Sequence, residues 1–221
     1  MSRSPRRPLV KVCGITNPAD GRAALAAGAD LLGFILASSP RRVSAAKAAR
    51  LVRSLRRAPG GCDALMVGVF RDAPAAAVLR AARAAGFDLV QLHGAESPAD
   101  VARLAAAGFR VIKVIKRLGA AAGRELRRYP AAWAFLIEKP VPKSWRGASR
   151  TADWRKARAA VAAHPRVGIA GNLSPANAAR ALRQAGRKVW LIDAASTLER
   201  EPGRKDHALV RRFVAAARAG K

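Results

Sequence analysis

The chain has 221 residues, of which 51% are hydrophobic, and its 42 Lys and Arg against 14 Asp and Glu give a formal net charge of +28. This length and apolar content can bury one substantial core, and no polar or low-complexity linker divides the chain. We therefore predict a single domain over residues 1–221, with residues 1–8 as a basic tail. Its two cysteines, Cys13 and Cys62, are too few for a disulfide framework or a zinc site, which indicates a reducing compartment.

The N-terminal MSRSPRRP segment is followed by too few apolar residues for a signal peptide, and no apolar run reaches membrane-spanning length. We expect a cytoplasmic protein without a membrane partner. The arginines are spread at helical spacing, as in LRAARAAG (79–86), and aromatic residues make up only 5% of the chain. Such spacing is typical of solvated helix faces rather than of a nucleic-acid site. A positive electrostatic field would nevertheless attract a polyanion, so a polyanion partner stays an alternative.

Short apolar stretches alternate with Ala-, Arg- and Leu-rich segments whose apolar residues recur at a period near 3.6. In chain order we predict strands at residues 9–13, 31–36, 64–70, 89–93, 110–115, 133–138, 166–170 and 189–193. Their uniformly apolar character is typical of parallel strands covered by helices, and the segments between them are long enough for helical crossovers. Eight such units fit an α/β fold, a parallel eight-stranded (β/α)8 TIM barrel. An open doubly wound sheet is the alternative, although no GxGxxG follows the first strand.

Several reactive side chains stand at the carboxyl ends of the predicted strands, where this architecture places catalytic groups. Cys13 closes the first strand, Glu138 closes the sixth, and Asp193 opens the DAAST turn after the eighth. Arg41 lies in the loop after the second strand. Position alone supports two interpretations of Cys13 equally: a buried structural residue and a reactive one. We interpret His93, at the end of the fourth strand, as structural.

Seven segments occur in the order found in one protein family: KVCGITNPAD, AGADLLGFILASSPRRVS, VGVF, FDLVQLHGAESP, GIAGNLSPANAARAL, DAASTLE and GRKDHALVRRF. Together they resemble phosphoribosylanthranilate isomerase of tryptophan biosynthesis over nearly the whole chain. The resemblance implies a TIM barrel that catalyses the Amadori rearrangement of N-(5-phosphoribosyl)anthranilate to 1-(2-carboxyphenylamino)-1-deoxyribulose 5-phosphate. It implies a small phosphorylated substrate and neither a cofactor nor a metal. A monomer and a homodimer both fit the barrel.

The resemblance also implies roles for individual residues. Cys13 matches the family's general base, and we expect a nearby cation or the backbone N–H groups that follow it to hold its pKa down. Arg41 matches an arginine that contacts the anthranilate carboxylate, and Asp193 matches a carboxylate at a substrate hydroxyl or amine. The residues that match the family's phosphate-binding turns are Gly171, Asn172, Ala195 and Ser196.

The sequence departs from the family at the acid and at the phosphate turns. The family's general acid is an aspartate, and Glu138 stands in its place, followed by a loop whose glycines are reduced to Gly147. Asn172 and Thr197 stand where the family has glycines, and a β-branched residue does not readily adopt a positive φ. Two alternatives to the isomerase therefore stay open: a diverged paralogue that acts on another phosphorylated amino-sugar, and a noncatalytic basic barrel that binds a polyanion.

Overall fold

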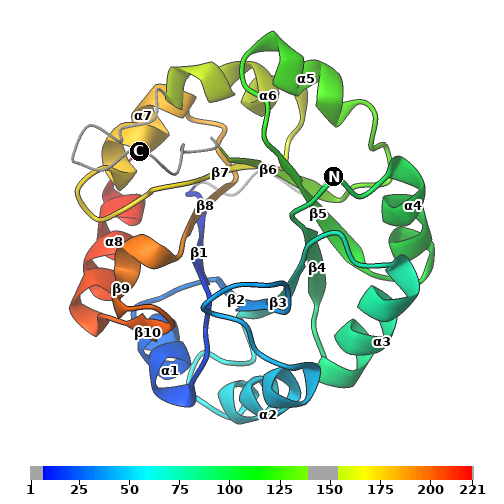
Figure 1. The fold of residues 1–221 in the computed structure, drawn as a ribbon. Helices are drawn as coiled ribbons and strands as arrows, with labels where there is room; N and C mark the ends of the chain where they lie inside the picture. The colour runs from blue at the N-terminus through cyan, green and yellow to red at the C-terminus, as the bar shows by residue number, and fades with distance from the viewer. Residues whose placement is uncertain (1–6, 139–153, 221) are drawn as a thin grey trace.

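Eight parallel strands close into a barrel in the order β1 to β8, and helices surround it (Figure 1). This computed structural model describes residues 7–138 and 154–220, so residues 1–6 of the tail and the segment that carries Gly147 lie outside the described residues. The strands are β1 (Leu9–Cys13), β2 (Leu31–Ile35), β3 (Leu65–Phe70), β4 (Leu89–Leu92), β5 (Arg110–Ile115), β6 (Ala134–Glu138), β7 (Val167–Ala170) and β8 (Leu191–Ala194). The closed barrel confirms the predicted TIM-barrel fold and excludes the open sheet.

The helices lie between consecutive barrel strands, as the sequence predicts, except α8, which follows the last strand. They are α1 (Pro18–Ala26), α2 (Ala45–Arg56), α3 (Ala75–Ala85), α4 (Pro98–Ala106), α5 (Ala120–Leu126), η1 (Trp154–Ala157), α6 (Arg158–Ala163), α7 (Ala178–Ala185) and α8 (His207–Ala219). Local signals set several of their ends. Ser97 and Asp100 form a reciprocal capping box at the start of α4, and Gly86 ends α3 in the left-handed region with φ 71°.

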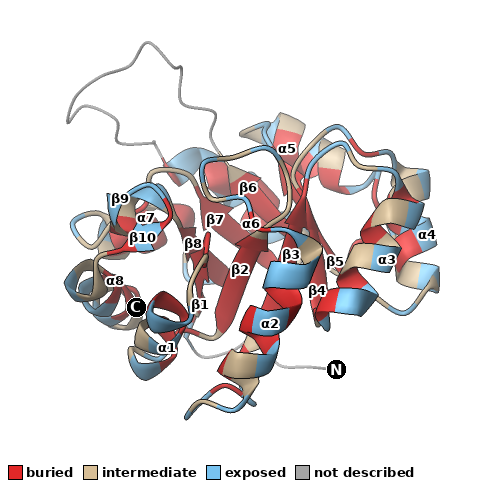
Figure 2. Cartoon of the chain, turned by 60° about the horizontal axis from the view of Figure 1, so that its bottom comes forward, coloured by how far each residue is buried: buried red, intermediate tan, exposed pale blue. Residues whose placement is uncertain are grey.

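Alternation along the strands divides the core into two apolar clusters. Figure 2 shows that the barrel strands are mostly buried. Successive side chains of a strand point to opposite faces. Leu31, Leu89 and Leu191 therefore belong to the smaller cluster inside the barrel, whereas Val12 and Val90 belong to the larger cluster between the barrel and its helices. Because both faces of each strand are covered, the strand ends are held in fixed positions around the barrel mouth.

Two lysines interrupt the apolar strands, so the expectation of uniformly apolar strands is wrong at these positions. Lys11 in β1 is fully buried and forms an ion pair with Asp193. Lys113 in β5 is 2% exposed and donates hydrogen bonds to the Gly94 carbonyl at 2.8 Å and to Glu96 at 3.0 Å. Burying a charge is costly unless it is paired and hydrogen-bonded, and both lysines meet this condition.

A short hairpin connects β8 to α8 and was not predicted. It consists of η2 (Ser196–Leu198), β9 (Glu199–Glu201) and β10 (Arg204–Lys205). Asp20 in α1 fixes it, because the Asp20 carboxylate accepts from the Lys205 backbone N–H at 2.9 Å and lies 2.9 Å from His207 Nε2. The hairpin thereby brings Glu199 against Arg41.

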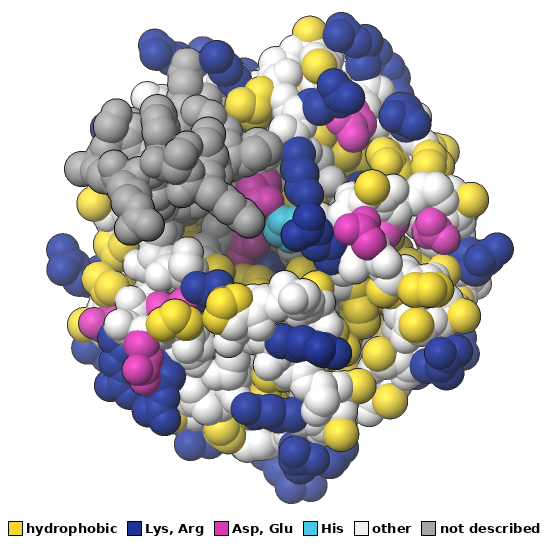
Figure 3. Space-filling view, viewed as in Figure 1, with side chains coloured by type: hydrophobic (Ala, Val, Ile, Leu, Met, Phe, Trp, Pro, Cys, Tyr) yellow, Lys and Arg dark blue, Asp and Glu magenta, His cyan; other side chains and the backbone are white. Residues whose placement is uncertain are grey.

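The basic side chains are spread over the molecule rather than gathered in one block on the face shown in Figure 3, where Lys and Arg lie around the whole outline. Acidic and histidine side chains lie near the middle of the same face, beside a few cationic ones. Within residues 7–138 and 154–220, no helix is long and apolar enough to cross a membrane.

Candidate active site

A cavity of about 140 Å³ opens at the carboxyl ends of the strands. Its wall includes Cys13 from β1, His93 after β4, Glu138 from β6 and Asp193 from β8. The turns after β7 and β8 complete the wall with Gly171, Asn172, Ala195, Ser196 and Thr197. The structure thus brings the predicted acid, base and phosphate-binding residues to one cavity. Arg41 does not line it.

The Cys13 thiol is buried beside two positive charges. Burial raises the pKa of Cys13 and outweighs the charges of Lys11 and Lys205, which lower it. The two backbone N–H groups that follow Cys13 both donate to the Gly33 carbonyl, at 2.9 Å each. The expectation that a cation or these N–H groups hold the thiol's pKa down is therefore wrong: the cations are present, but burial dominates.

Asp193 forms an ion pair at the cavity. Its Oδ2 atom accepts a hydrogen bond from Lys11 Nζ at 2.9 Å. Burial alone would lower the pKa of Lys11, but the charges of Asp193 and Cys13 and the hydrogen bonds to them together outweigh burial, so the pKa of Lys11 is raised and the lysine stays positive. The second carboxylate oxygen, Oδ1, is buried and accepts no hydrogen bond from any described residue. Asp193 therefore keeps one acceptor atom available.

Glu138 is held by His93, a contact that the structural interpretation of His93 missed. His93 Nε2 lies 2.6 Å from Glu138 Oε2, and Gln91 Nε2 lies 3.3 Å from His93 Nδ1. Burial alone would raise the pKa of Glu138, but the hydrogen bond to His93 and nearby positive charges outweigh it, so the pKa lies below its usual range. The available signal was the strand alternation, which puts Gln91 and His93 on the same face because they are two residues apart.

Arg41 lies in the loop after β2, and Glu199 binds its guanidinium. Arg41 Nε lies 2.8 Å and 2.9 Å from the two Glu199 oxygens, and Nη2 lies 2.7 Å from Oε2. Lys205 Nζ donates to the same carboxylate at 2.8 Å. Arg41 is therefore fixed through its Nε and Nη2 edge. These bonds do not use its Nη1 donors.

The two substituted turn positions behave differently. Gly171 has φ 89° and Asn172 has φ 53°, so the turn after β7 keeps consecutive left-handed residues, a conformation that Asn tolerates better than most residues. Thr197 lies in η2 and is not among the described residues with positive φ. Its hydroxyl donates to the Leu173 carbonyl. Asn172 thus preserves a left-handed turn, whereas Thr197 belongs to a turn with negative φ.

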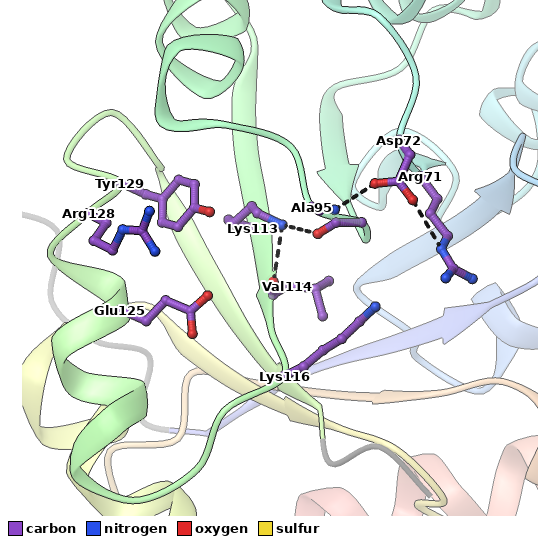
Figure 4. A pocket seen from close by; sticks show the side chains of 10 residues that line it. Arg71, Asp72, Ala95, Lys113, Val114, Lys116, Glu125, Arg128 and Tyr129 are labelled. Carbon is purple, nitrogen blue, oxygen red and sulfur yellow. Dashed lines mark hydrogen bonds and ion pairs between the residues drawn. The ribbon is translucent and has the colours of Figure 1, made fainter. Parts of the chain in front are cut away.

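A second cavity, of about 390 Å³, opens beside the ends of β3 to β5 (Figure 4). Several of its charged groups already bind one another. Lys113 Nζ donates to the Gly94 carbonyl at 2.8 Å. Asp72 accepts from the Ala95 backbone N–H at 2.6 Å and lies 3.5 Å from Arg71 Nε. This cavity contains none of the predicted site residues, so the smaller cavity is the candidate active site. No cluster of three or more His, Cys, Asp or Glu that could hold a metal ion occurs in the described ranges.

The chain is similar to known proteins along nearly its whole length. The family model described as N-(5'-phosphoribosyl)anthranilate (PRA) isomerase matches residues 10–216. An N-(5'-phosphoribosyl)anthranilate isomerase from Rubrobacter xylanophilus is 39% identical over 211 residues, which cover 95% of this chain and 98% of that protein.

Solved structures agree with this match. A phosphoribosyl anthranilate isomerase in complex with reduced 1-(o-carboxyphenylamino)-1-deoxyribulose 5-phosphate has a TM-score of 0.81 and 26% identity, covering 95% of this chain and 98% of that chain. A structure of monomers generated from the dimeric Thermotoga maritima enzyme has the same TM-score of 0.81, identity of 26% and coverage of 95% and 98%. With its barrel, its strand-end cavity and these matches, the chain belongs to the N-(5'-phosphoribosyl)anthranilate isomerase family and is an isomerase of tryptophan biosynthesis.

Proposed function

We propose that the cavity at the strand ends converts N-(5'-phosphoribosyl)anthranilate into 1-(2-carboxyphenylamino)-1-deoxyribulose 5-phosphate, with Glu138 as the acid and Cys13 as the base. The observation that carries the proposal is that both side chains line one cavity together with the turns after β7 and β8. A related structure holds a reduced form of the same ketose phosphate, which supports this product class.

The reaction consists of proton transfers that balance. Glu138 donates a proton to the furanose oxygen, the bond from that oxygen to C1 breaks, and the nitrogen lone pair forms a protonated Schiff base. Cys13 removes the proton from C2. The electron pair of the broken C–H bond forms the C1–C2 double bond of an enol, and the C=N electrons return to nitrogen. Cys13 then returns the proton to C1 while Glu138 accepts the proton of the enol hydroxyl, which gives the ketose and restores both side chains.

The raised pKa of Cys13 fits this order of steps. Lys11 and Lys205 favour the thiolate, but burial outweighs them. Ring opening adds a further positive charge, the protonated Schiff base, next to C2 and hence next to the base. A nearby positive charge favours the ionised thiol. The ionised form of Cys13 is therefore most favoured after Glu138 has opened the ring, which couples the second step to the first.

The remaining groups bind the substrate. Asp193 Oδ1, a buried acceptor without a partner among the described residues, accepts from the substrate amine or hydroxyl. Arg41 binds the anthranilate carboxylate through its Nη1 donors while Glu199 holds its other edge. The phosphate lies against the backbone N–H groups of the two turns. These turns contain Gly171, Asn172, Ala195 and Ser196. In the turn after β7, the consecutive left-handed residues Gly171 and Asn172 shape an anion-binding concavity.

Location and assembly follow from the same proposal. A thiol base requires a compartment that keeps Cys13 reduced, and we therefore place the protein in the cytoplasm. The Thermotoga maritima relative is described as dimeric. Size-exclusion chromatography with light scattering distinguishes the monomer from the homodimer for this chain.

Complementation of a tryptophan auxotroph that lacks this isomerase tests the function. The wild-type chain should restore growth, and the purified protein should remove the fluorescence of phosphoribosylanthranilate made in situ. Cys13→Ser serves as the matched negative control. A folded wild-type protein that binds the reduced ketose phosphate but shows no turnover would contradict the proposal and favour the diverged paralogue.

A further inference from the structure

Three side chains form a hydrogen-bonded row in the cavity wall. Gln91 and His93 come from the end of β4, and Glu138 comes from the end of β6. Gln91 Nε2 lies 3.3 Å from His93 Nδ1, and His93 Nε2 lies 2.6 Å from Glu138 Oε2. Gln91 is only 1% exposed. The row therefore links a buried amide to the acid of the proposed reaction.

The amide nitrogen fixes the tautomer of the imidazole. An amide NH2 group only donates, so His93 Nδ1 accepts from Gln91 and the ring proton is on Nε2. His93 Nε2 then donates to Glu138, whose carboxylate accepts as an anion. In this arrangement Glu138 holds no proton for the furanose oxygen. The pair must take up a proton before ring opening, and the row determines where that proton resides.

The oxygen of the Gln91 amide can accept a hydrogen bond from His93 when the imidazole carries this extra proton. Gln91 Oε1 is buried, and no donor reaches it within residues 7–138 and 154–220. A buried carbonyl without a partner is unusual in folded proteins. A half-turn of the amide exchanges Oε1 with Nε2, and Oε1 then accepts a hydrogen bond from a protonated Nδ1. The same side chain thus matches both the neutral and the doubly protonated imidazole.

We infer that His93 stores the proton that Glu138 delivers, and that the Gln91 amide turns over when His93 takes this proton up. The inference rests on the proposed role of Glu138 as the acid. Doubly protonated His93 passes its Nε2 proton to Glu138 as Glu138 protonates the ring oxygen. His93 then keeps its Nδ1 proton, bound to Gln91 Oε1. The proton lost from the enol hydroxyl returns through Glu138 to Nε2, and His93 is again doubly protonated. His93 acts through Glu138 and is therefore a positioning residue.

Other charged groups face the pair from neighbouring strands. Lys116 follows β5, and Lys11 lies in β1; both positive charges favour the ionised form of Glu138. Asp193 in β8 and Glu138 affect each other as like charges. Lys116, Lys11 and Asp193 stay unchanged in the variants proposed below. A change in the imidazole resonances of His93 in those variants therefore reports on the row itself.

The first test observes the tautomer directly. The chain has three histidines, so nitrogen-15 NMR of the imidazoles can be assigned with a His93→Asn variant. In the wild type we expect the Nε2–H tautomer at neutral pH. Glu138→Gln removes the anionic acceptor of the Nε2 proton and should shift the Nε2 resonance. Gln91→Leu removes the partner of Nδ1 and should shift the Nδ1 resonance, while the Nε2–H tautomer stays because Glu138 still accepts from Nε2.

Three outcomes of this test would overturn the inference: an Nδ1–H tautomer in the wild type at neutral pH, an unchanged Nε2 resonance in Glu138→Gln, or an unchanged Nδ1 resonance in Gln91→Leu. None of these readouts requires turnover. If the protein proves inactive as an isomerase but the NMR results hold, only the proposed function fails, so the two failures are distinguishable.

The second test uses kinetics. His93→Asn should lower kcat on the order of 10²-fold with KM nearly unchanged, and should remove the limb of the kcat profile that reports loss of the stored proton as pH rises. His164→Asn is the control, because His164 Nδ1 accepts from the Arg166 backbone N–H at 3.1 Å and the side chain lies outside the cavity lining. Its kcat should stay unchanged. A His93→Asn variant with wild-type kcat and pH profile would contradict the inference.

Discussion

The Cys13 side chain combines opposing effects, because burial raises its pKa while two lysines lower it. A serine hydroxyl in the same position is far less acidic and does not ionise near neutral pH. Cys13→Ser should therefore lower kcat by on the order of 10²-fold or more, the range in which a lost general base falls. KM should change little, because the side chain keeps nearly its size. The fluorescence assay measures both constants, and an equally active variant would contradict the role of Cys13 as base.

Glu138 is one methylene group longer than the aspartate that the resemblance implies for the acid, and this methylene lets its carboxylate contact His93. The longer side chain reaches His93 at 2.6 Å. Glu138→Asp restores the family's residue but withdraws the carboxylate from His93. Since misplacement by about 1 Å can cost on the order of 10²-fold, we expect a kcat reduced by about tenfold or more. Glu138→Gln cannot donate the proton and should lose still more.

The control for this pair of variants is binding of the reduced ketose phosphate by calorimetry, which should be similar in the wild type and in both variants. If Glu138→Asp instead matches or exceeds the wild-type kcat, the contact with His93 does not position the acid.

At this scale the sequence predicts positions better than contacts. Cys13, Glu138 and Asp193 could be found because each stands at the end of an apolar run, and the ends of parallel strands meet at one rim. The partner of Arg41 could not be found in the same way. Its carboxylate, Glu199, lies 158 residues further along the chain, in a segment without periodicity.

The elements differ in how clearly the sequence encodes them. The eight barrel strands have both faces covered, so each appears as an apolar run, and the predicted ranges agree with the observed bounds to within two residues at each end. The β9–β10 hairpin has strands of three and two residues, too short for any alternation to be visible. Its position depends instead on polar contacts from Asp20, which only the folded chain reveals.

Asp20 joins α1 to the hairpin and to α8, and its contribution to stability should depend on pH. Burial alone would raise the pKa of Asp20, but hydrogen bonds from the Lys205 backbone N–H and from His207 outweigh it, so the pKa is lowered from 3.8. A carboxyl whose pKa is lower in the folded state contributes stability above its unfolded pKa and loses it as pH falls through the folded value. Asp20→Asn should therefore be destabilised at pH 7, by on the order of 1 kcal/mol.

The measurement is urea unfolding of the wild type and of Asp20→Asn at pH 7 and at pH 3. The difference in unfolding free energy should shrink at the lower pH, where the wild-type carboxylate begins to take up its proton. Asp63→Asn, at an exposed position, is the control and should behave as the wild type at both values. A difference that stays constant with pH would show that Asp20 acts through packing alone.

In the whole molecule, different residues stabilise the barrel and carry out the chemistry. The apolar residues of the two clusters hold the strands in register. Glu138, Asn172 and Thr197, which differ from the family's usual residues, all line the cavity at the strand ends. The core therefore fixes where a catalytic side chain stands, whereas its exact reach depends on the residue type at the rim. This is why the fold and the position of Glu138 could be predicted from the apolar pattern alone, while the role of Glu138 as the acid required the resemblance.

The net charge of +28 belongs to this largest scale, since Lys and Arg lie around the whole outline of the face in Figure 3. A dispersed positive field attracts phosphates without distinguishing one nucleotide sequence from another. Each phosphate that is neutralised makes the slope of log binding constant against log salt concentration steeper by about 0.9. We expect two labelled DNA duplexes of different sequence to bind with equal affinity in fluorescence anisotropy, and to dissociate as salt rises from about 50 to about 200 mM. Saturating duplex should leave kcat unchanged, because helix faces rather than the cavity would hold it. Tight binding near physiological salt, with several-fold discrimination between the sequences, would instead require an organised nucleic-acid site and would favour the polyanion-binding barrel.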